Sequence, residues 1–201
     1  MTAPPGRRER KKAATRQKIA DTALRLFIER GYDAVGIRDV AAEADVAVTT
    51  VFSHFASKEA LVFERDDDFE QRLTRAVTDR APDEPLIPAL RREIRDMVRH
   101  CAADGSDPVW RMIDGSPALR QYEESMRLRH AESLATAIAA GPGGDRTPTA
   151  CRTLARFVVD AHALGREAAE PDAAVDEIFA MIEAAWEAAL PARPARVSGT
   201  P

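Results

Sequence analysis

The chain has 201 residues, of which 45% are hydrophobic and only 5% aromatic. This length suits one medium-sized domain or a small domain joined to a larger one, and the many Ala, Leu, Arg and Glu residues favour helices. No segment has the roughly 18 uninterrupted apolar residues of a membrane span. No apolar signal-peptide region follows the basic N-terminus, so we expect a cytoplasmic protein without membrane contact.

The net charge of −4 is unevenly distributed along the chain. Residues 1–58 contain 11 Lys or Arg against 7 Asp or Glu, a balance of +4, whereas residues 59–201 contain 18 against 26, a balance of −8. Attraction to phosphate therefore belongs to the N-terminal part, and the remainder would be repelled by DNA. This asymmetry indicates two parts with different functions.

The N-terminal part is expected to hold a tail and three short helices. Residues 1–12 show no apolar periodicity and are interpreted as a disordered basic arm. Apolar residues then repeat at helical spacing up to Arg30, and Gly31 is suited to end that helix. A second helix begins at Ile37, a turn follows over Ala44–Ala47, and Val51, Phe52 and Phe55 mark a third helix.

The remaining chain is interpreted as six further helices, which makes about nine in an all-α protein without strands. Ser57 can cap a fourth helix that runs to about Thr78. Breaker-rich connections at 81–88, 104–108 and 141–148 separate the later ones. These are expected at about 89–103, 109–113, 117–140, 149–169 and 172–189. The Pro-rich segment 191–201 is expected to be a disordered tail.

The second and third helices, with their short turn and the basic arm before them, have the pattern of a helix-turn-helix, which places one short helix in the major groove. Ser and Thr hydroxyls can reach phosphates or base edges, and a Val or Thr methyl can contact a thymine methyl. His54 could read a base, contact a phosphate or cap the local structure. A bundle with this spacing by chance is the alternative. The candidate DNA-binding residues are Arg38, Val48, Thr49, Thr50, Phe52, Ser53, His54 and Lys58.

At this point the chain resembles the TetR family of bacterial transcriptional regulators. The resemblance runs from about Thr15 to Val62 and includes LFIERGYDAV, DVAAEADV and TTVFSHFASKEAL, the last of which is similar to the signature T-x-Y-x-H-F-x-S-K-E-x-L. Three positions depart from the family pattern. Asp45 replaces the usual turn glycine, Ala47 replaces the serine that caps the third helix, and Phe52 replaces a tyrosine that contacts phosphate.

The resemblance implies a DNA-binding domain over 13–62 and an effector-binding and dimerisation domain over 63–190. In the family the last two helices form a four-helix bundle with the partner's, so a palindromic operator is expected. Part of this surface must also serve the core of the monomer. The expected dimer residues are Phe157, Val158, Ala161, Leu164, Ile178, Phe179, Ile182 and Trp186.

The family also encloses a small-molecule effector between its DNA-binding head and the dimer helices. Flexible Met and aromatic side chains suit a hydrophobic or amphipathic ligand, with His, Tyr and Arg to fix a polar group. Alternatively, Met97, Met126, Trp110 and Tyr122 belong to the core, and Arg127 and Arg129 are solvated. The candidate ligand-binding residues are Phe69, Met97, His100, Cys101, Trp110, Met112, Ile113, Tyr122, Met126, Arg129 and His130.

Other classes of function receive little support from the residues. No histidine lies in a catalytic or metal-binding motif, and the acidic run Asp66–Asp68 is interpreted as a solvated face. Cys101 and Cys151 lack zinc spacing and suit buried positions, with a regulatory thiol as the alternative. The sequence therefore predicts a dimeric, ligand-responsive repressor of transcription without a cofactor. An architectural protein that has the head but no ligand response remains the alternative.

Overall fold

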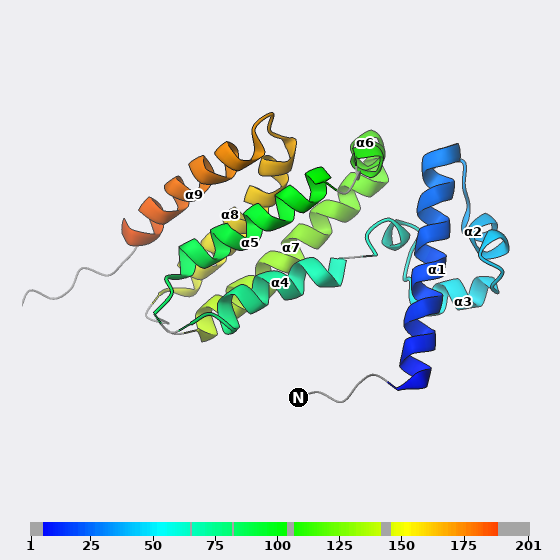
Figure 1. Ribbon diagram of the computed structural model, residues 1–201, viewed down its shortest axis with the longest axis horizontal. Coiled ribbons are helices and arrows are strands. Elements are labelled where there is room, and N and C mark those ends of the chain that lie inside the picture. Colours follow the sequence, from blue (N-terminus) through cyan, green and yellow to red (C-terminus); the bar gives the residue numbers. More distant parts are fainter. Residues whose placement is uncertain (1–5, 65, 82, 104–106, 142–145, 189–201) are drawn as a thin grey trace, which may run out of the picture. The chain divides into compact units, whose positions relative to one another are not determined.

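The computed structural model describes residues 6–64, 66–81, 83–103, 107–141 and 146–188. Within these ranges the chain forms nine α-helices, one short 3₁₀ helix and no strand, which confirms the all-α prediction (Figure 1). The helices are α1 (Arg7–Arg30), α2 (Ile37–Glu43), α3 (Val48–His54), η1 (Glu59–Leu61), α4 (Asp66–Thr78), α5 (Leu86–Ala103), α6 (Asp107–Gly115), α7 (Pro117–Ala140), α8 (Pro148–Glu167) and α9 (Pro171–Ala188).

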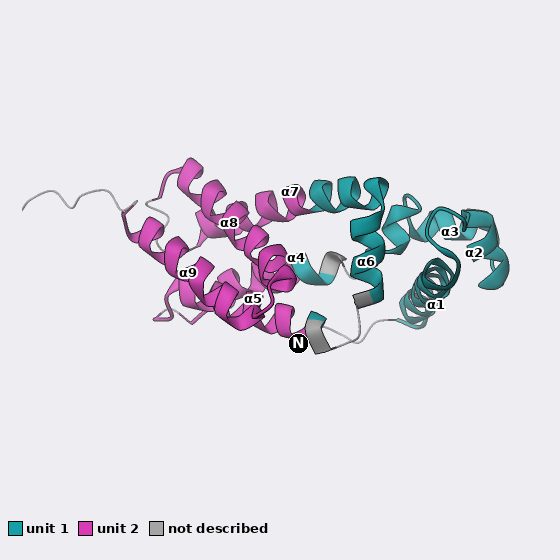
Figure 2. Ribbon diagram, turned by 90° about the horizontal axis from the view of Figure 1, so that it is seen from above, with its two compact units in different colours: residues 1–69, 101–126 teal, residues 70–100, 127–201 magenta. Residues whose placement is uncertain are grey.

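The chain divides into two compact units (Figure 2). The first unit comprises residues 1–69 and 101–126, and the second comprises residues 70–100 and 127–201. The helix-turn-helix and α6 therefore lie in the first unit, while α8 and α9 lie in the second. The expected C-terminal tail, 191–201, falls outside the described residues.

Helix α1 begins at Arg7, earlier than the predicted start at Ala13. The Glu9 carboxylate accepts a hydrogen bond from the Gly6 backbone N–H at 3.0 Å, which satisfies a donor at the helix start, and its negative charge favours the first turn. The expectation of a disordered arm is therefore wrong for residues 7–12, which are helical. The helix ends as predicted at Gly31, which has a φ of 88°.

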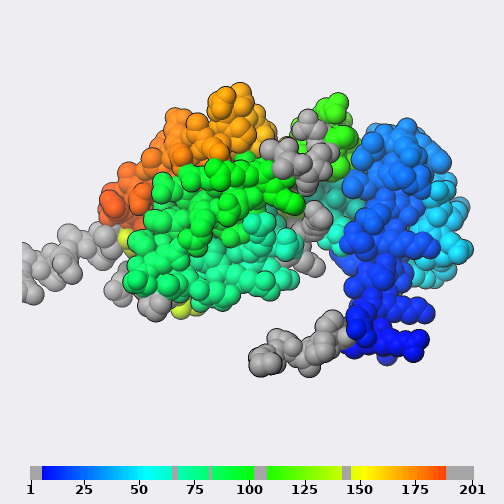
Figure 3. All heavy atoms as spheres, viewed as in Figure 1, coloured from blue at the N-terminus to red at the C-terminus, as the bar shows by residue number. Residues whose placement is uncertain are grey.

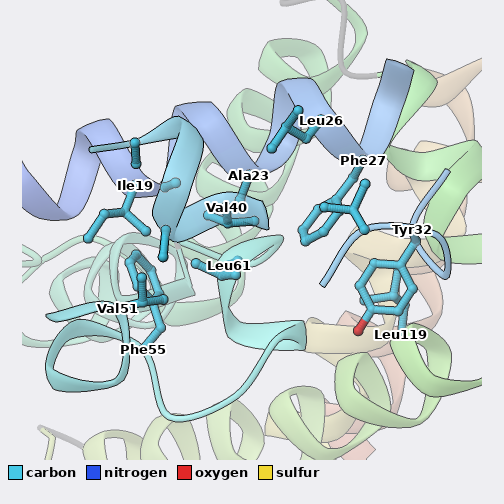
Figure 4. Packing of buried hydrophobic residues seen from close by; sticks show 14 of the residues in the cluster. Ile19, Ala23, Leu26, Phe27, Tyr32, Val40, Val51, Phe55, Leu61 and Leu119 are labelled. Atoms are coloured by element: carbon cyan, nitrogen blue, oxygen red, sulfur yellow. The ribbon is translucent and has the colours of Figure 1, made fainter. Parts of the chain in front are cut away.

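The core of the first unit joins α1 to both helices of the helix-turn-helix (Figure 4). Ile19, Ala23 and Leu26 form the buried stripe of α1, and Val51 and Phe55 meet them from α3 and the residue after it. Two further members, Ile113 and Leu119, come from α6 and the start of α7. Helix α6, expected in the effector region, thus packs on the DNA-binding head.

The predicted helix from Ser57 to Thr78 is wrong, because the structure divides it into η1 and α4. The Ser57 hydroxyl does accept a hydrogen bond from the Ala60 N–H at 3.3 Å, but the helix that follows ends at Leu61. Leu61, Val62 and Phe63 all pack on the same core. Successive residues of an α-helix point about 100° apart, so three in a row cannot all face one core unless the helix is interrupted.

The five later helices, α5 to α9, all have a proline in the first turn. Helix α5 begins at Leu86, earlier than the predicted Ala89, because Pro88 lies in the first turn, where a missing N–H costs nothing. Helix α8 begins at Pro148, and the Thr147 hydroxyl accepts a hydrogen bond from the Ala150 N–H at 3.2 Å. Its start agrees with the prediction to one residue.

The second unit is built on close packing of α8 against its neighbours. A Cβ atom at Gly165 would lie 2.8 Å from Val175 Cγ2 and 3.3 Å from Val98 Cγ2, so glycine permits this approach of α8 to α9 and α5. Arg99 also forms a bidentate ion pair with Asp172, in which Nε lies 2.9 Å from Oδ1 and Nη2 lies 2.9 Å from Oδ2. Because that pair is exposed, the packing contributes more stability than the charges do.

Candidate nucleic-acid interface

The turn between α2 and α3 has the geometry that a helix-turn-helix needs. Asp45 has a φ of 51°, in the left-handed region where the family pattern has glycine. Asp tolerates this region better than most residues but still at some cost. The Val46 N–H donates to the Ala41 carbonyl at 3.0 Å, and the Val46 side chain packs against the core, as predicted. The departure at Asp45 therefore leaves the turn intact.

The start of α3 lacks a side-chain cap. Ala47 occupies the N-cap position with extended backbone, and no side chain accepts a hydrogen bond from the first turn. The Ala47 carbonyl still accepts from the Thr50 N–H at 2.8 Å. A serine at this position would typically add about 1 kcal/mol of stability, so the alanine that replaces the family's usual serine makes α3 measurably less stable.

Helix α3 has one buried and one exposed face. Val51 is fully buried and Phe55 directly after the helix is 2% exposed, whereas Phe52 is 55% exposed. Thr49 and Ser53 share the exposed face with Phe52. The Ser53 hydroxyl donates to the Thr50 carbonyl at 2.7 Å, which leaves its oxygen able to accept from a partner.

Two of the candidate residues on α3 are less exposed than predicted. Val48, expected to face outward, is partly buried against the core. It lies about one helical turn before the buried Val51 and therefore shares that residue's side of the helix. Thr50 is half-buried. The exposed face therefore narrows to Thr49, Phe52 and Ser53.

His54 ends α3 in a partly buried position next to positive charges. Its Nδ1 is buried without a hydrogen-bond partner, and its backbone carbonyl accepts from Arg16 Nη1 at 2.5 Å. Burial first, and then the charges of Lys12 and Arg16, lower the pKa of the imidazole. The environment therefore favours the neutral form of the His54 imidazole. A direct base contact and a phosphate contact stay predictions.

Arg16, which the sequence pattern did not single out, ties α1 to the end of α3. Its guanidinium lies 4.3 Å from the centroid of the Phe55 ring, its Nε is 3.6 Å from a Glu64 carboxylate oxygen, and it donates to the last carbonyl of α3. A cation near a helix C-terminus is favoured by the helix dipole. The available signal was its place at the edge of the apolar stripe, three residues before Ile19.

Lys58, expected to contact a phosphate, has its ammonium engaged inside the first unit. Lys58 Nζ donates to the Tyr32 carbonyl oxygen at 2.6 Å and lies 4.0 Å from the centroid of the Tyr32 ring. Burial lowers the pKa of this lysine. The neighbouring Glu59 accepts from the Tyr32 hydroxyl at 2.9 Å. Sequence reasoning missed Tyr32 and Glu59 as functional candidates, although both belong to the family pattern.

Positive charge on the first unit gathers on the first turns of α1. All five cations there are exposed, and Figure 3 shows this end of the helix, in dark blue, as an accessible surface. Arg38, in the first turn of α2, is exposed as well. The five cations of α1 are Arg7, Arg8, Arg10, Lys11 and Lys12.

The candidate effector residues divide between the two units. In the first unit, Ile113 belongs to the head core, Trp110 and Met112 pack against it, and Tyr122 stacks on Phe63 at 5.4 Å. In the same unit Phe69 and Cys101 are half-buried, and Met126 is buried. In the second unit Met97 and His130 are buried, whereas His100 and Arg129 are exposed.

An open hollow of about 440 Å³ lies between the end of α1 and α6. Met112 is the member of the predicted ligand set that lines it, beside Tyr32, Asp33 and Arg111. The burial of Met97 and Met126, which are 4% and 6% exposed, fits the alternative that they belong to the core. The remaining ligand assignments stay predictions.

Half of the expected dimer residues belong to the core of the second unit. Val158, Ala161 and Phe179 are fully buried and Ile182 is 4% exposed, so their contacts are made within the unit. Helices α8 and α9 pack on each other and use these apolar stripes to do so, and a role of the four residues in the dimer contact stays a prediction.

The other dimer candidates remain accessible on α8 or partly covered on α9. Phe157 and Leu164 are 49% and 54% exposed. Ile178 is half-buried, and the Trp186 ring lies 4.1 Å below the Arg146 guanidinium. Met181, which sequence reasoning missed, is 61% exposed on α9, and its position off the buried stripe of that helix was the signal.

The described part of the chain contains no helix that is both long and apolar enough to cross a membrane. Neither Cys101 nor Cys151 forms a disulfide within the described residues, and Cys151 is buried as expected while Cys101 is half-buried.

Comparison with known proteins agrees with this geometry. A model of the family described as bacterial regulatory proteins, tetR family, matches residues 19–64. The chain is 33% identical over 143 residues to the HTH-type transcriptional repressor Rv3405c of Mycobacterium tuberculosis, an alignment that covers 69% of this chain and 75% of that protein. It is 30% identical over 154 residues to the HTH-type transcriptional regulator TcmR of Streptomyces glaucescens, covering 70% and 66% respectively.

Solved structures share the fold. The TetR family repressor AlkX from a Dietzia strain matches with a TM-score of 0.60 and 19% identity, covering 87% of this chain and 98% of that one. A TetR-family regulator from Streptomyces coelicolor matches with a TM-score of 0.58 and 24% identity, covering 88% and 99%. The family match and the relative that is 33% identical over 143 residues establish that this chain belongs to the tetR family of bacterial regulatory proteins and is a DNA-binding transcriptional regulator, not an enzyme.

Proposed function

We propose that this regulator is a repressor that binds a palindromic operator as a homodimer and is released by a small hydrophobic or amphipathic molecule. The observation that carries the DNA-binding part is the division of α3 into a buried face and an exposed face beside an exposed cationic helix end. The relative in Mycobacterium tuberculosis is named a repressor, which favours repression over activation here.

The exposed face of α3 has the chemistry for reading base edges. The Thr49 hydroxyl can donate to or accept from a base, the Ser53 oxygen can accept, and the Phe52 ring can contact a thymine methyl. Val51 and Phe55 hold the opposite face in the core, so the helix is presented as a rigid element. We therefore place Thr49, Phe52 and Ser53 in the major groove.

Phosphate contacts in this proposal come from the first turns of α1 and from Arg38. A side chain that neutralises a phosphate releases counterions, so each such contact makes binding more sensitive to salt. The exposed cations of α1 are displayed on a helix and need no ordering of a flexible arm at the moment of binding. This reduces the entropy cost that a disordered arm would add.

Dimerisation in this proposal uses the apolar side chains that the second unit leaves exposed. Phe157 and Leu164 are seven residues apart on α8, two helical turns, and therefore share a face. Met181 adds a third exposed apolar side chain from α9. Exposed apolar side chains of this size are typical of an interface between subunits.

The effector part of the proposal rests on residue chemistry and on family neighbours. Met, Tyr, Trp and His side chains are the types that line adaptable ligand sites. One protein that shares the fold is EbrR, a multidrug binding protein with 22% identity to this chain and a TM-score of 0.51. A ligand that binds better to an arrangement of the dimer that does not fit the operator would increase the population of that arrangement. Operator affinity would then fall.

The DNA-binding part is tested with a double variant, Thr49→Ala with Ser53→Ala. Fluorescence anisotropy with the DNA upstream of the regulator's own gene would measure affinity. The loss of two base contacts is expected to weaken binding about a hundredfold. The control is Ser125→Ala with Thr136→Ala, because those exposed hydroxyls also donate to their own helix carbonyls. Equal affinities of the two double variants would contradict the proposal.

The effector part needs a separate experiment. A collection of hydrophobic and amphipathic compounds is screened for those that raise the melting temperature, and each one that does is added to the protein–DNA complex. We expect at least one compound to release DNA. Compounds that stabilise the protein but leave operator affinity unchanged would instead support the architectural alternative.

A further inference from the structure

The C-terminal end of α3 is held by the side chain of Arg16, which lies on α1, 38 residues before His54. Its Nη1 donates to the His54 carbonyl oxygen at 2.5 Å. Its guanidinium carbon lies 4.3 Å from the centroid of the Phe55 ring, and its Nε lies 3.6 Å from a Glu64 carboxylate oxygen. One guanidinium therefore contacts the end of α3, the residue after it and the segment after η1.

The α1 side of this contact is anchored by the core of the first unit. Arg16 lies three residues before Ile19 and therefore on the same side of the helix. Ile19 and Ala23 are fully buried, and the Phe55 ring packs in the same core next to Ile19 and Val51 (Figure 4). Arg16 thus extends from a fixed support to the end of α3.

Helix α3 has few interactions of its own that fix its length and direction. It has seven residues, whereas helices of fewer than about 12 residues are only marginally stable in isolation. Its N-cap residue, Ala47, provides no side-chain acceptor. At the other end, the His54 carbonyl has no N–H partner within the helix, and Arg16 supplies a cationic donor to it. The contact with Arg16 therefore stabilises the end of a helix that is weak by itself.

The three contacts of Arg16 differ in strength. A hydrogen bond from a charged donor is stronger than one between neutral groups. The Phe55 ring is only 2% exposed, and a cation is attracted to an aromatic ring more strongly where water is excluded. The ion pair with Glu64 joins side chains that are 33% and 21% exposed, so solvent screens it. The contacts with the end of α3 therefore dominate.

We propose that Arg16 is a positioning residue for operator recognition, which sets the direction of the exposed face of α3 by holding the His54 carbonyl and the Phe55 ring. The inference rests on the proposed DNA-binding role of α3. Ser53 directly precedes His54, and Thr49 lies about one turn before Ser53 on the same exposed face. Hydrogen bonds weaken steeply as their angle departs from linear, so a shift of the helix end weakens the contacts of these hydroxyls with base edges.

The difference between operator and random DNA tests this role. Arg16→Met keeps an apolar stem beside the Phe55 ring and removes the donors. Lys18→Met removes the same charge from an exposed residue of α1 and is the matched control. We expect Arg16→Met to bind the DNA upstream of the regulator's own gene about tenfold more weakly than the control, the factor of one charge-assisted hydrogen bond. Affinities for a shuffled sequence of equal length should agree within about twofold, because both variants lose one charge.

Two other roles for Arg16 give different results in the same experiment. A direct phosphate contact would lower the affinities for both DNA sequences in parallel, and it would reduce the slope of log affinity against log salt relative to Lys18→Met. A role in stability alone would leave operator affinity equal to that of the control at a temperature where both variants are fully folded. Either result would contradict the proposal.

Amide hydrogen exchange followed by NMR tests the positioning without DNA. The Phe55 N–H closes the last turn of α3 and the Gly31 N–H closes the last turn of α1, each in a 2.9 Å hydrogen bond to a carbonyl one turn earlier. We expect Arg16→Met to exchange the Phe55 amide about tenfold faster than Lys18→Met does, with the Gly31 amide unchanged. Unchanged exchange at Phe55, or equal acceleration at both amides, would overturn the inference. If the wild-type protein binds no DNA, the proposed function fails, yet this comparison still decides whether Arg16 holds α3.

Discussion

Helices α3 and α8 both have one buried and one exposed face, but their exposed faces differ in chemistry. On α3, Thr49 and Ser53 are exposed around a single aromatic ring, and cationic turns of α1 lie in the same unit. On α8, the exposed face carries Phe157 and Leu164. A polar face beside positive charge suits nucleic acid, whereas an apolar face suits another protein surface.

The comparison shows that exposure of a side chain carries more functional information than its presence in an apolar pattern. In both helices the strongest apolar positions, such as Val51 and Val158, are fully buried within their own unit. What remains for a partner is the part of each helix that the core does not use. The predictions below test this division of labour, beginning with the largest expected effect.

The largest effect is expected from truncating the buried phenylalanine after α3. Phe55→Ala removes a 2% exposed ring from the head core and should lower the free energy of unfolding by about 3–5 kcal/mol. Phe52→Ala removes a 55% exposed ring and should change that free energy by less than about 0.5 kcal/mol while weakening DNA binding. Urea denaturation and anisotropy measure the two quantities. Similar stability losses in both variants would mean that α3 has no free face.

A pH effect is expected in the second unit. Burial, followed by the charges of Arg166, Arg127, Arg72 and His130, lowers the pKa of His162 from an ordinary 6.5 to about 4. The unfolded chain therefore takes up a proton below pH 6.5 that the native state refuses, and stability falls as the pH drops from 6.5 towards 4. The shift corresponds to a loss of up to about 3 kcal/mol.

The pH effect is checked by denaturation of the wild-type protein and of His162→Gln across this range. The variant lacks the titrating group, so its stability should fall less steeply over the same interval. Parallel curves for the two proteins would show that His162 binds its proton equally in the folded and unfolded states.

The exposed face of α8 is tested through the oligomeric state. Phe157→Glu together with Leu164→Glu should weaken dimerisation at least thirtyfold, because buried apolar anchors are typically worth about 2 kcal/mol or more each. Sedimentation velocity over a concentration series measures this. Ile28→Glu, which places the same charge on a 48% exposed apolar residue of α1, is the matched control and should leave the dimer intact. Unchanged association in the α8 variant would remove this face from the interface.

The smallest effect is expected at the start of α3. Ala47→Ser restores a side-chain acceptor at an N-cap that lacks one and should raise the free energy of unfolding by about 1 kcal/mol. The same denaturation experiment detects it. A variant no more stable than the wild-type protein would show that another group already satisfies the first turn.

The helix-turn-helix was predictable because its signals are local. The spacing of Val40, Val51 and Phe55 marks the buried face, and the positive φ of Asp45 confirms the turn expected there. Which core or surface the residues of the later helices belong to was less predictable. Ile113 could not be assigned to the head core, nor Phe179 to the monomer's own packing, because an apolar stripe does not say which surface it covers.

Contacts between residues far apart in the sequence explain the other differences between prediction and structure. Lys58 fits a phosphate contact in sequence, and only the fold brings it to the Tyr32 carbonyl, 26 residues earlier in the chain. Arg16 similarly reaches the His54 carbonyl across 38 residues. The break after Leu61 depends on three consecutive side chains facing one core, which overrides the local helical pattern.

The most direct test of the central claim, that the exposed face of α3 enters the major groove, is protection of guanine N7 from methylation by dimethyl sulfate, because N7 lies in that groove. The account predicts protection in two half-sites related by a two-fold axis, retained by Ser125→Ala with Thr136→Ala and lost when Thr49, Phe52 and Ser53 are replaced by alanine. Full-affinity binding without N7 protection, or protection that survives the triple alanine variant, would contradict it.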